Sequence, residues 1–150
     1  GDYTLAIISN DLKNKNRLNK NTIVGTILSN LGLLEYCKNN DIEFITTNVG
    51  DKYVLEYLRD NNLSLGGEEA GHIILKEYCN TGDGPLTSLI MLSILASTNT
   101  TFSNLTKIMH KYPEVHINIK VNNKNDFPHL RIPVITFIIP LSFRSINCCK

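Results

Sequence analysis

Two spacings of hydrophobic residues follow one another along the chain, and each change of spacing predicts a change of secondary structure. Leu5, Ile8 and Leu12 recur every three or four residues, as on the buried side of an amphipathic helix. Residues 22–28 instead form a short run rich in β-branched side chains, typical of a strand buried on both faces. The same criteria predict helices over residues 2–15, 30–39, 51–62, 86–95 and 101–109, and strands over residues 22–28, 42–46, 63–66 and 72–75.

Strands and helices alternate through most of the chain, which indicates an α/β domain. This order favours a three-layer α/β/α sandwich built on a short, largely parallel mixed sheet. The helix predicted over residues 86–95 is apolar nearly all round. We therefore expect it to be sandwiched between other elements rather than to lie on the surface.

The C-terminal quarter of the chain has a different character. Residues 115–121 alternate strictly between apolar and polar side chains, which predicts a strand with one wet face that suits the start of a neighbouring domain. The tail over residues 126–150 contains three prolines and few turn or cap signals. It stays unassigned, with a strand over residues 134–139 as the alternative.

Length and charge exclude some classes of protein. A chain of 150 residues has room for one ordinary domain, and a net charge of +1 predicts no basic surface for nucleic acid. The basic residues at positions 13, 15, 17 and 20 have no aromatic side chains between them, so they indicate a solvated face. We therefore expect no nucleic-acid partner.

The cysteines and histidines are not spaced as metal ligands, so no metal site is predicted. Cys37, Cys79, Cys148 and Cys149 form no C-x-x-C pair, and we expect reduced thiols. The first residues do not resemble a signal peptide. The longest apolar stretch, residues 132–143, is too short for a membrane span and is broken by prolines. These features predict a cytoplasmic protein without a membrane partner.

A glycine-rich loop over residues 66–72 is the first candidate for chemistry. Its glycines allow close approach of a ligand to the backbone. Glu68 supplies an acceptor for hydroxyl groups, and His72 supplies an imidazole that can transfer protons. The loop is therefore interpreted either as a polyol-binding loop or as a tight connection between strands with exposed glutamates.

A second candidate lies where the strand over residues 42–46 leads into the next helix. Gly50 occupies the turn, and Lys52 falls in the first helical turn. Backbone N–H groups at a helix N-terminus attract anions, and a neighbouring lysine strengthens such a site for phosphate. The alternative is an ordinary Asp51 cap with Lys52 in solvent. Both loops are expected near sheet ends, where α/β proteins commonly bind ligands, and at the same rim of the sheet, so that they converge on one ligand.

Four ordered motifs resemble bacterial phosphoglucosamine mutases, members of the α-D-phosphohexomutase superfamily. They are T-I-L-S-N-L-G at residues 26–32, V-G-D-K-Y-V at 49–54, L-G-G-E-E-A-G-H-I-I at 65–74 and T-G-D-G at 81–84. The T-G-D-G motif alone favours a helix cap over a phosphate cradle, because it lacks the G-K-[ST] of a phosphate loop. The resemblance covers roughly residues 1–124 and corresponds to the third of the family's four domains.

The resemblance implies a division of the chain and of the chemistry. Residues 1–20 would be the terminal helix of a preceding domain and a connector, residues 21–112 the sugar-recognition α/β/α domain, and residues 113–125 a strand or linker toward a fourth domain. The family interconverts glucosamine 6-phosphate and glucosamine 1-phosphate, using Mg²⁺ and a phosphorylated serine. The implied partners are a hexosamine phosphate and the missing domains of the same enzyme.

Specific residues take family roles by resemblance. Glu68 would accept hydrogen bonds from sugar hydroxyls, His72 would assist proton transfer, and Gly50 would lie in the second loop facing the substrate. Lys52 stands where the family usually has Arg, and Ala70 stands where it has Ser. Both differences leave the sugar specificity open, because each removes hydrogen-bonding capacity.

The motifs for the rest of the reaction are missing from this sequence. We find no phosphoserine loop, no D-G-D-x-D-R metal motif and no phosphate-binding loop of the fourth domain. Since phosphoryl transfer depends on these parts, we expect the chain alone to be inactive and to bind no cofactor. The alternatives are a non-catalytic interaction module or degenerate remnant, and a domain of a phosphomannomutase or phosphoglucomutase.

Overall fold

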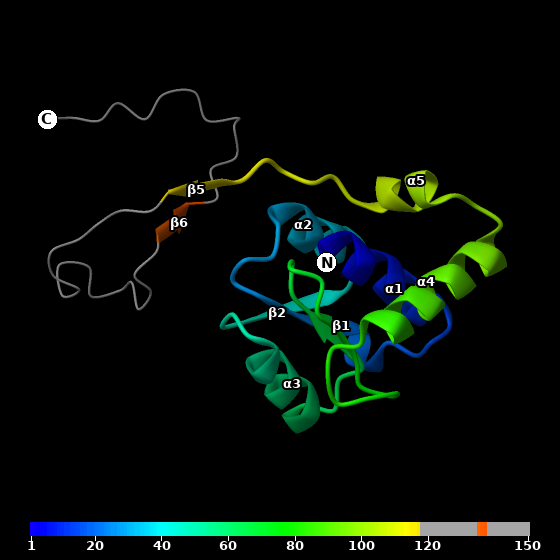
Figure 1. Cartoon of the computed structure of the whole chain (residues 1–150), viewed down its shortest axis with the longest axis horizontal. Coiled ribbons are helices and arrows are strands. Elements are labelled where there is room, and N and C mark those ends of the chain that lie inside the picture. The colour runs from blue at the N-terminus through cyan, green and yellow to red at the C-terminus, as the bar shows by residue number, and fades with distance from the viewer. Residues whose placement is uncertain (118–134, 138–150) are drawn as a thin grey trace, which may run out of the picture. The chain divides into compact units, whose positions relative to one another are not determined.

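The computed structural model describes residues 1–117 and 135–137, and the chain separates into two compact units, residues 1–111 and 112–150. The first unit holds most of the regular structure (Figure 1). Its elements are α1 (Asp2–Asn14), η1 (Asn19–Asn21), β1 (Thr22–Thr26), α2 (Leu31–Asn39), β2 (Glu43–Thr47), α3 (Asp51–Asp60), β3 (Leu65–Gly67), β4 (Ile73–Leu75), α4 (Gly84–Thr98), α5 (Phe102–Leu105) and η2 (Thr106–Ile108).

The strands of the first unit form one mixed sheet in the order β2-β1-β3-β4. β1 pairs in parallel with both β2 and β3, in a register that places Val24 beside Ile45 and Gly66. β4 pairs antiparallel with β3 at the other edge. The predicted fold class, a three-layer α/β/α arrangement on a largely parallel mixed sheet, is confirmed.

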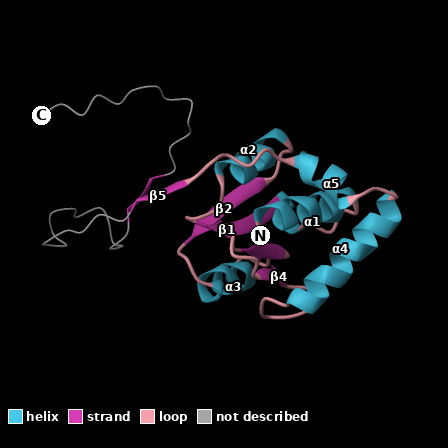
Figure 2. Ribbon diagram, turned by 45° about the horizontal axis from the view of Figure 1, so that its top comes forward, coloured by secondary structure: helices cyan, strands magenta, loops and turns pink. Residues whose placement is uncertain are grey.

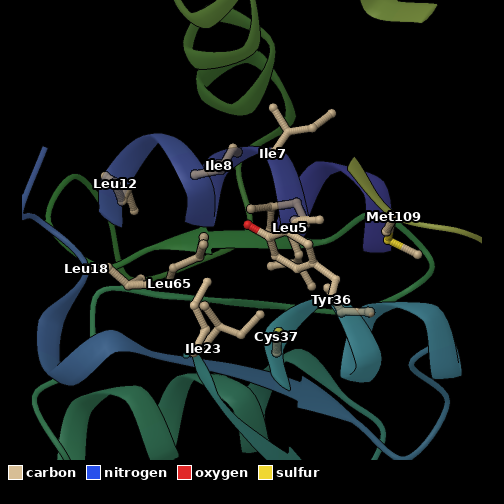
Figure 3. Close-up of a cluster of buried hydrophobic side chains, with 14 of the residues drawn as sticks. Leu5, Ile7, Ile8, Leu12, Leu18, Ile23, Tyr36, Cys37, Leu65 and Met109 are labelled. Carbon is tan, nitrogen blue, oxygen red and sulfur yellow. The ribbon is translucent and has the colours of Figure 1, made fainter. Parts of the chain in front are cut away.

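Alternate residues of the central strand β1 supply the two cores, one on each face of the sheet. Ile23 joins the larger core, which α1 and α2 cover, and Val24 joins the smaller core beneath α3. The helices are seen on both sides of the sheet in Figure 2, and the larger core in Figure 3. All five residues of β1 are buried, as predicted for a strand covered on both faces.

Gly66 allows α3 to pack closely against the middle of the sheet. A Cβ atom added to Gly66 would lie 2.7 Å from Val54 Cγ1 and 2.9 Å from the Val24 carbonyl oxygen. Val54 and Leu58 are the residues by which α3 contributes to the smaller core. A side chain at position 66 would therefore push α3 away from the strands whose ends carry the loops of interest.

Two helix starts follow the expected capping chemistry. The Asn30 side chain accepts a hydrogen bond from the Gly32 N–H at the start of α2. The Asp83 side chain accepts one from the Leu86 N–H at the start of α4, so the T-G-D-G segment serves as a helix cap. These short-range contacts satisfy N–H groups that a helix leaves without internal partners.

α1 lies inside the first unit, whereas the resemblance assigned residues 1–20 to a preceding domain. Leu5 and Ile8 are fully buried in the larger core, and α1 contacts α2, α4 and β3. Two basic residues of the connector after α1 also make their contacts within this unit. Arg17 pairs with Glu77 at 2.5 Å, and Lys20 Nζ donates to the Asn61 carbonyl at 2.9 Å. The helix and connector are therefore part of the domain they pack in.

The prediction that the apolar helix near residues 86–95 would be sandwiched is wrong. α4 runs along the margin of the first unit (Figures 1 and 2), and Ile94 is its one buried residue. Leu89 and Leu92 are 66% and 55% exposed. A helix that is apolar all round is covered on one side only in the part of the chain that the structure describes.

The second unit contains β5 (Val115–Ile117) and β6 (Ile135–Phe137), which pair antiparallel with Val115 beside Phe137. β5 is the start of the strand predicted over residues 115–121, and β6 falls within the alternative strand over residues 134–139. The remainder of both predictions lies outside the described residues. None of the helices in the described ranges is both long and apolar enough to cross a membrane.

Candidate functional site

The two candidate loops leave the same edge of the sheet. β2 ends at Thr47 and β3 ends at Gly67, and both strands run parallel to β1. The carboxyl ends of parallel strands meet at one edge, so the loop before α3 and the loop between β3 and β4 emerge there together. The sequence predicted both loops at the same rim of the sheet, and the structure places both there.

A direct hydrogen bond joins the two loops. The Gly50 N–H donates to Glu68 Oε1 at 2.8 Å. Gly50 has φ of 127°, a conformation that favours glycine, and it is the N-cap of α3. Its carbonyl accepts hydrogen bonds from the N–H groups of Tyr53 and Val54. Gly50 therefore starts α3 with its carbonyl and holds the neighbouring loop with its N–H group.

The Glu68 carboxylate has one oxygen occupied by this bond and one oxygen directed toward His72. The Glu68 side chain is only 12% exposed, and its Oε2 lies 3.8 Å from His72 Nδ1. The loop itself is closed by the Glu68 N–H, which donates to the His72 carbonyl at 3.0 Å. The carboxylate is thus rigidly held, while the His72 ring is 63% exposed and open to a ligand.

The remaining predicted site residues lie at the solvent side of these loops. The Lys52 side chain is 74% exposed, with its Nζ atom 3.9 Å from Glu56 Oε1, one turn along α3. Ala70 is exposed at the tip of the glycine-rich loop. The structure therefore brings Gly50, Glu68 and His72 together in one cluster, and leaves Lys52 and Ala70 at its rim. Their roles in binding stay predictions.

One contact of the loop has no signal in the local sequence. Lys111 Nζ forms an ion pair with Glu69 Oε1 at 2.9 Å. Lys111 is the last residue of the first unit and lies far along the chain from Glu69. The sequence predicts no partner for Glu69, because no spacing rule connects two positions so distant. The ion pair holds the glycine-rich loop against the segment that ends this unit.

Metal ions in proteins are usually held by several His, Cys, Asp or Glu side chains together. No group of three or more His, Cys, Asp and Glu side chains that could hold a metal ion occurs among residues 1–117 and 135–137. Glu68 and His72 contribute a single carboxylate and a single imidazole. The cluster of Gly50, Glu68 and His72 is suited to hydrogen bonding with hydroxyl groups and to proton exchange. It is not a set of ligands for the Mg²⁺ that the resemblance implies.

Replacing Gly50 with alanine should strain the turn that starts α3. We expect the Gly50→Ala variant to lose about 1–3 kcal/mol of unfolding free energy, because only glycine readily adopts this backbone conformation. Urea denaturation followed by circular dichroism measures the loss. Gly84→Ala is the matched control, since a Cβ there meets no atom within 4 Å and the backbone is not left-handed. An equal effect of both substitutions would contradict this account of the turn.

Comparison with solved structures shows which proteins share the fold of this α/β/α unit. The chain superimposes on a putative phosphomannomutase from Thermus thermophilus with a TM-score of 0.66 and 24% identity, covering 71% of this chain and 24% of the other. It superimposes on N-acetylphosphoglucosamine mutase from Aspergillus fumigatus with a TM-score of 0.65 and 18% identity, covering 83% and 30%. At these identities the likeness shows a shared fold.

Sequence comparison identifies the family. Residues 1–112 match the family model described as phosphoglucomutase/phosphomannomutase, alpha/beta/alpha domain III, and the chain belongs to this family. It is 48% identical over 123 residues to a phosphoglucosamine mutase from Clostridium botulinum strain Kyoto, covering 82% of this chain and 27% of that protein. A phosphoglucosamine mutase from Thermodesulfovibrio yellowstonii is 44% identical over 124 residues, covering 83% and 28%.

These matches confirm the family resemblance seen in the four motifs. The chain spans little more than a quarter of the length of the relatives it matches. The described unit of residues 1–111 coincides closely with the matched domain, and this match includes α1. The helix is thus within domain III both by its packing and by its sequence.

Proposed function

We propose that this chain is the sugar-recognition domain of a phosphoglucosamine mutase, which converts glucosamine 6-phosphate to glucosamine 1-phosphate. The observation that carries the proposal is the hydrogen bond from the Gly50 N–H to Glu68 Oε1. It links the two loops whose motifs resemble the family, and it leaves Glu68 Oε2 to accept a hydrogen bond. The 48% identity to a phosphoglucosamine mutase supports this substrate over other hexose phosphates.

Each residue has a chemical role in this proposal. Glu68 accepts a hydrogen bond from a sugar hydroxyl, and the exposed His72 ring exchanges a proton with the bound sugar. Lys52 lies in the first turn of α3, where the helix dipole and its ammonium both favour a phosphate group. Ala70 leaves the loop tip without a hydroxyl, so one contact to the sugar is missing.

We further propose that the chain alone does not catalyse the reaction. The phosphoserine and Mg²⁺ that the family uses would belong to other domains of a longer polypeptide. Those domains are the proposed protein partners, and the cytoplasm is the proposed location, where sugar phosphates occur. One domain supplies only part of a ligand site that several domains share, so it makes few contacts with the ligand. Binding of the sugar phosphate should therefore be weak, about millimolar in Kd.

Titration of the ¹⁵N-labelled chain with glucosamine 6-phosphate tests the proposed site. We expect the ligand to shift the amide resonances of residues 48–52 and 67–72. In Glu68→Gln the Kd for the ligand should rise about tenfold or more, because a hydrogen bond to a charged group is worth ~1.5–3 kcal/mol. The glutamine can still accept from the Gly50 N–H, so the loops stay joined. Glu77→Gln, an exposed glutamate near Arg17, is the matched control.

The outcomes separate the proposal from its alternatives. Equal shifts with glucose 6-phosphate would favour a phosphoglucomutase or phosphomannomutase domain, because the 2-amino group would not matter. Shifts produced equally by inorganic phosphate would indicate an anion site without sugar recognition. No shift at the two loops, or unchanged affinity of Glu68→Gln, would reject the assignment of these residues.

A further inference from the structure

An open cavity of about 480 Å³ lies at the edge of the sheet opposite to the candidate loops. Its lining comes from the connector after α1, the end of α3, the residues before β3 and the residues after β4. The amino ends of the parallel strands β1 and β3 lie at this edge, whereas Gly50 and Glu68 follow the carboxyl ends of β2 and β3. The cavity is therefore separated from the proposed sugar site by roughly the length of a strand.

Both arginines in the described ranges, Arg17 and Arg59, line this cavity together with Lys76. Among the described residues of the lining, Glu77 is the single carboxylate. Arg59 is in the last turn of α3, where the helix dipole favours a cation, but Arg17 and Lys76 lie outside helices. Like charges repel one another, so the convergence of three cations from distant segments, in a chain with a net charge of +1, favours a bound anion that offsets them.

The two guanidinium groups have N–H groups left for a ligand. In the described part of the chain, Arg17 donates from Nη2 alone, to Glu77 Oε2 and to the Tyr78 hydroxyl. Arg59 donates from Nε to Asp60 Oδ1 at 3.0 Å. A guanidinium group carries five N–H donors in a planar fork, so both arginines can also hold oxygen atoms of an anion.

The walls of the cavity are fixed before a ligand arrives. The Asn19 N–H donates to Ser64 Oγ at 3.0 Å, and the Asn19 side chain donates to the Asn62 carbonyl at 3.1 Å. These bonds tie the connector after α1 to the segment between α3 and β3. Leu58 and Leu63, buried in the smaller core, supply the apolar part of the lining. A preformed cavity with an apolar part and a few polar groups is typical of a small-molecule site.

We propose that this cavity binds a small phosphate ester through Arg17, Arg59 and Lys76. A phosphate monoester has three acceptor oxygens and up to two negative charges, which suit three cationic side chains, whereas a carboxylate has two oxygens. The amide and hydroxyl groups of the lining suit a polar remainder of the ligand rather than a nucleobase, since no aromatic side chain lines the cavity among residues 1–117 and 135–137. The cavity shares no residue with the Gly50–Glu68 cluster, so this proposal does not depend on the proposed function.

Titration of the ¹⁵N-labelled 150-residue chain with glycerol 3-phosphate tests the proposal. This probe is a phosphate ester without a sugar ring, and constant ionic strength keeps general screening unchanged. We expect the probe to shift the amide resonances of residues 16–19, 58–64 and 76–77. The Kd should be about millimolar, because few groups contact a ligand of this size. Residues 48–52 and 67–72 report separately on the proposed sugar site.

Variants of the lining residues show whether the charged side chains hold the probe. The double variant Arg17→Gln with Arg59→Gln should keep its circular dichroism spectrum, because both side chains are exposed, and should raise the Kd about tenfold or more. Lys38→Gln with Lys107→Gln is the matched control, because it removes two exposed positive charges that do not line the cavity, and the Kd should not change. Glu77→Gln should lower the Kd several-fold, since it removes the carboxylate that competes for Arg17.

Four results would overturn the proposal. Equal shifts from sulfate would show an adventitious ion only. Equal or stronger binding of malonate would indicate a carboxylate ligand instead of a phosphate ester. An unchanged Kd in the double glutamine variant would remove the arginines from the site. Shifts confined to residues 48–52 and 67–72 would leave the cavity without a ligand, and this last result would not contradict the proposed function.

Discussion

Replacing Leu5 with alanine should lower the unfolding free energy of the first unit by about 2–5 kcal/mol. Leu5 is fully buried in the larger core, and its helix α1 contacts α2, α4 and β3. The truncation removes apolar contacts and leaves a cavity that close neighbours can fill only in part. Urea denaturation followed by circular dichroism measures the loss.

The matched control is the same substitution on the surface. Leu89→Ala removes the same atoms from a side chain that is 66% exposed, so it should change the unfolding free energy by less than about 1 kcal/mol. Similar small losses for both variants would mean that α1 is peripheral to the unit, as the end of a preceding domain would be. A large loss for Leu5→Ala alone agrees with α1 as part of domain III.

Elements that depend on neighbouring residues were predictable from the sequence. The caps at Asn30 and Asp83 need only residues two or three positions away, and both caps are present. The buried strand β1 has its own signal, a run of β-branched side chains. The order of these elements and their hydrophobic spacing were enough for the α/β/α fold class, because short connections leave few ways to stack helices on a parallel sheet.

Elements whose environment depends on distant residues were not predictable. The apolar pattern of α4 was read as full burial, but the spacing of hydrophobic residues does not tell which element covers a helix. The Gly50–Glu68 and Lys111–Glu69 contacts join positions 18 and 42 residues apart, and no periodicity reports such pairs. The sequence therefore predicted the residue types of the site and a shared rim for its two loops, while the contacts between individual residues needed the fold.

The hydrogen bond between the two loops also changes the interpretation of Glu68. The sequence suggested either an acceptor for sugar hydroxyls or a tight connection with exposed glutamates, and the Glu68 side chain is mostly buried and engaged with Gly50. A carboxylate fixed in this way is prepared for a ligand, since it loses little conformational freedom on binding. Removal of Glu68 would therefore affect both the shape of the site and its hydrogen bonding, which is why the proposed test uses glutamine rather than alanine.

Cys37 should react with iodoacetamide far more slowly than Cys79 in the folded chain. Burial raises the pKa of the Cys37 thiol to about 12, while the Cys79 side chain is only partly buried. The thiolate is the reactive form of cysteine. A rise in pKa from 9.0 to about 12 reduces the thiolate population of Cys37 about 1,000-fold at pH 8. Peptide mass spectrometry after timed alkylation separates Cys37 from Cys79, Cys148 and Cys149, and equal rates in urea are the control.

The same burial predicts a fall in stability at alkaline pH. The pKa of Cys37 is higher in the folded chain than its ordinary value of 9.0, so the folded state retains a proton that the unfolded state releases. The resulting stabilisation is complete below pH 9 and is lost as the pH rises toward about 12, at ~1.4 kcal/mol per unit of pKa difference. Burial also raises the pKa of Tyr36, which acts in the same direction.

Urea denaturation between pH 8 and 11 tests this expectation. The unfolding free energy should decline less steeply with pH in Cys37→Ala than in the unaltered chain, because the variant has no thiol to ionise. An identical decline would contradict the burial of a neutral thiol in this core.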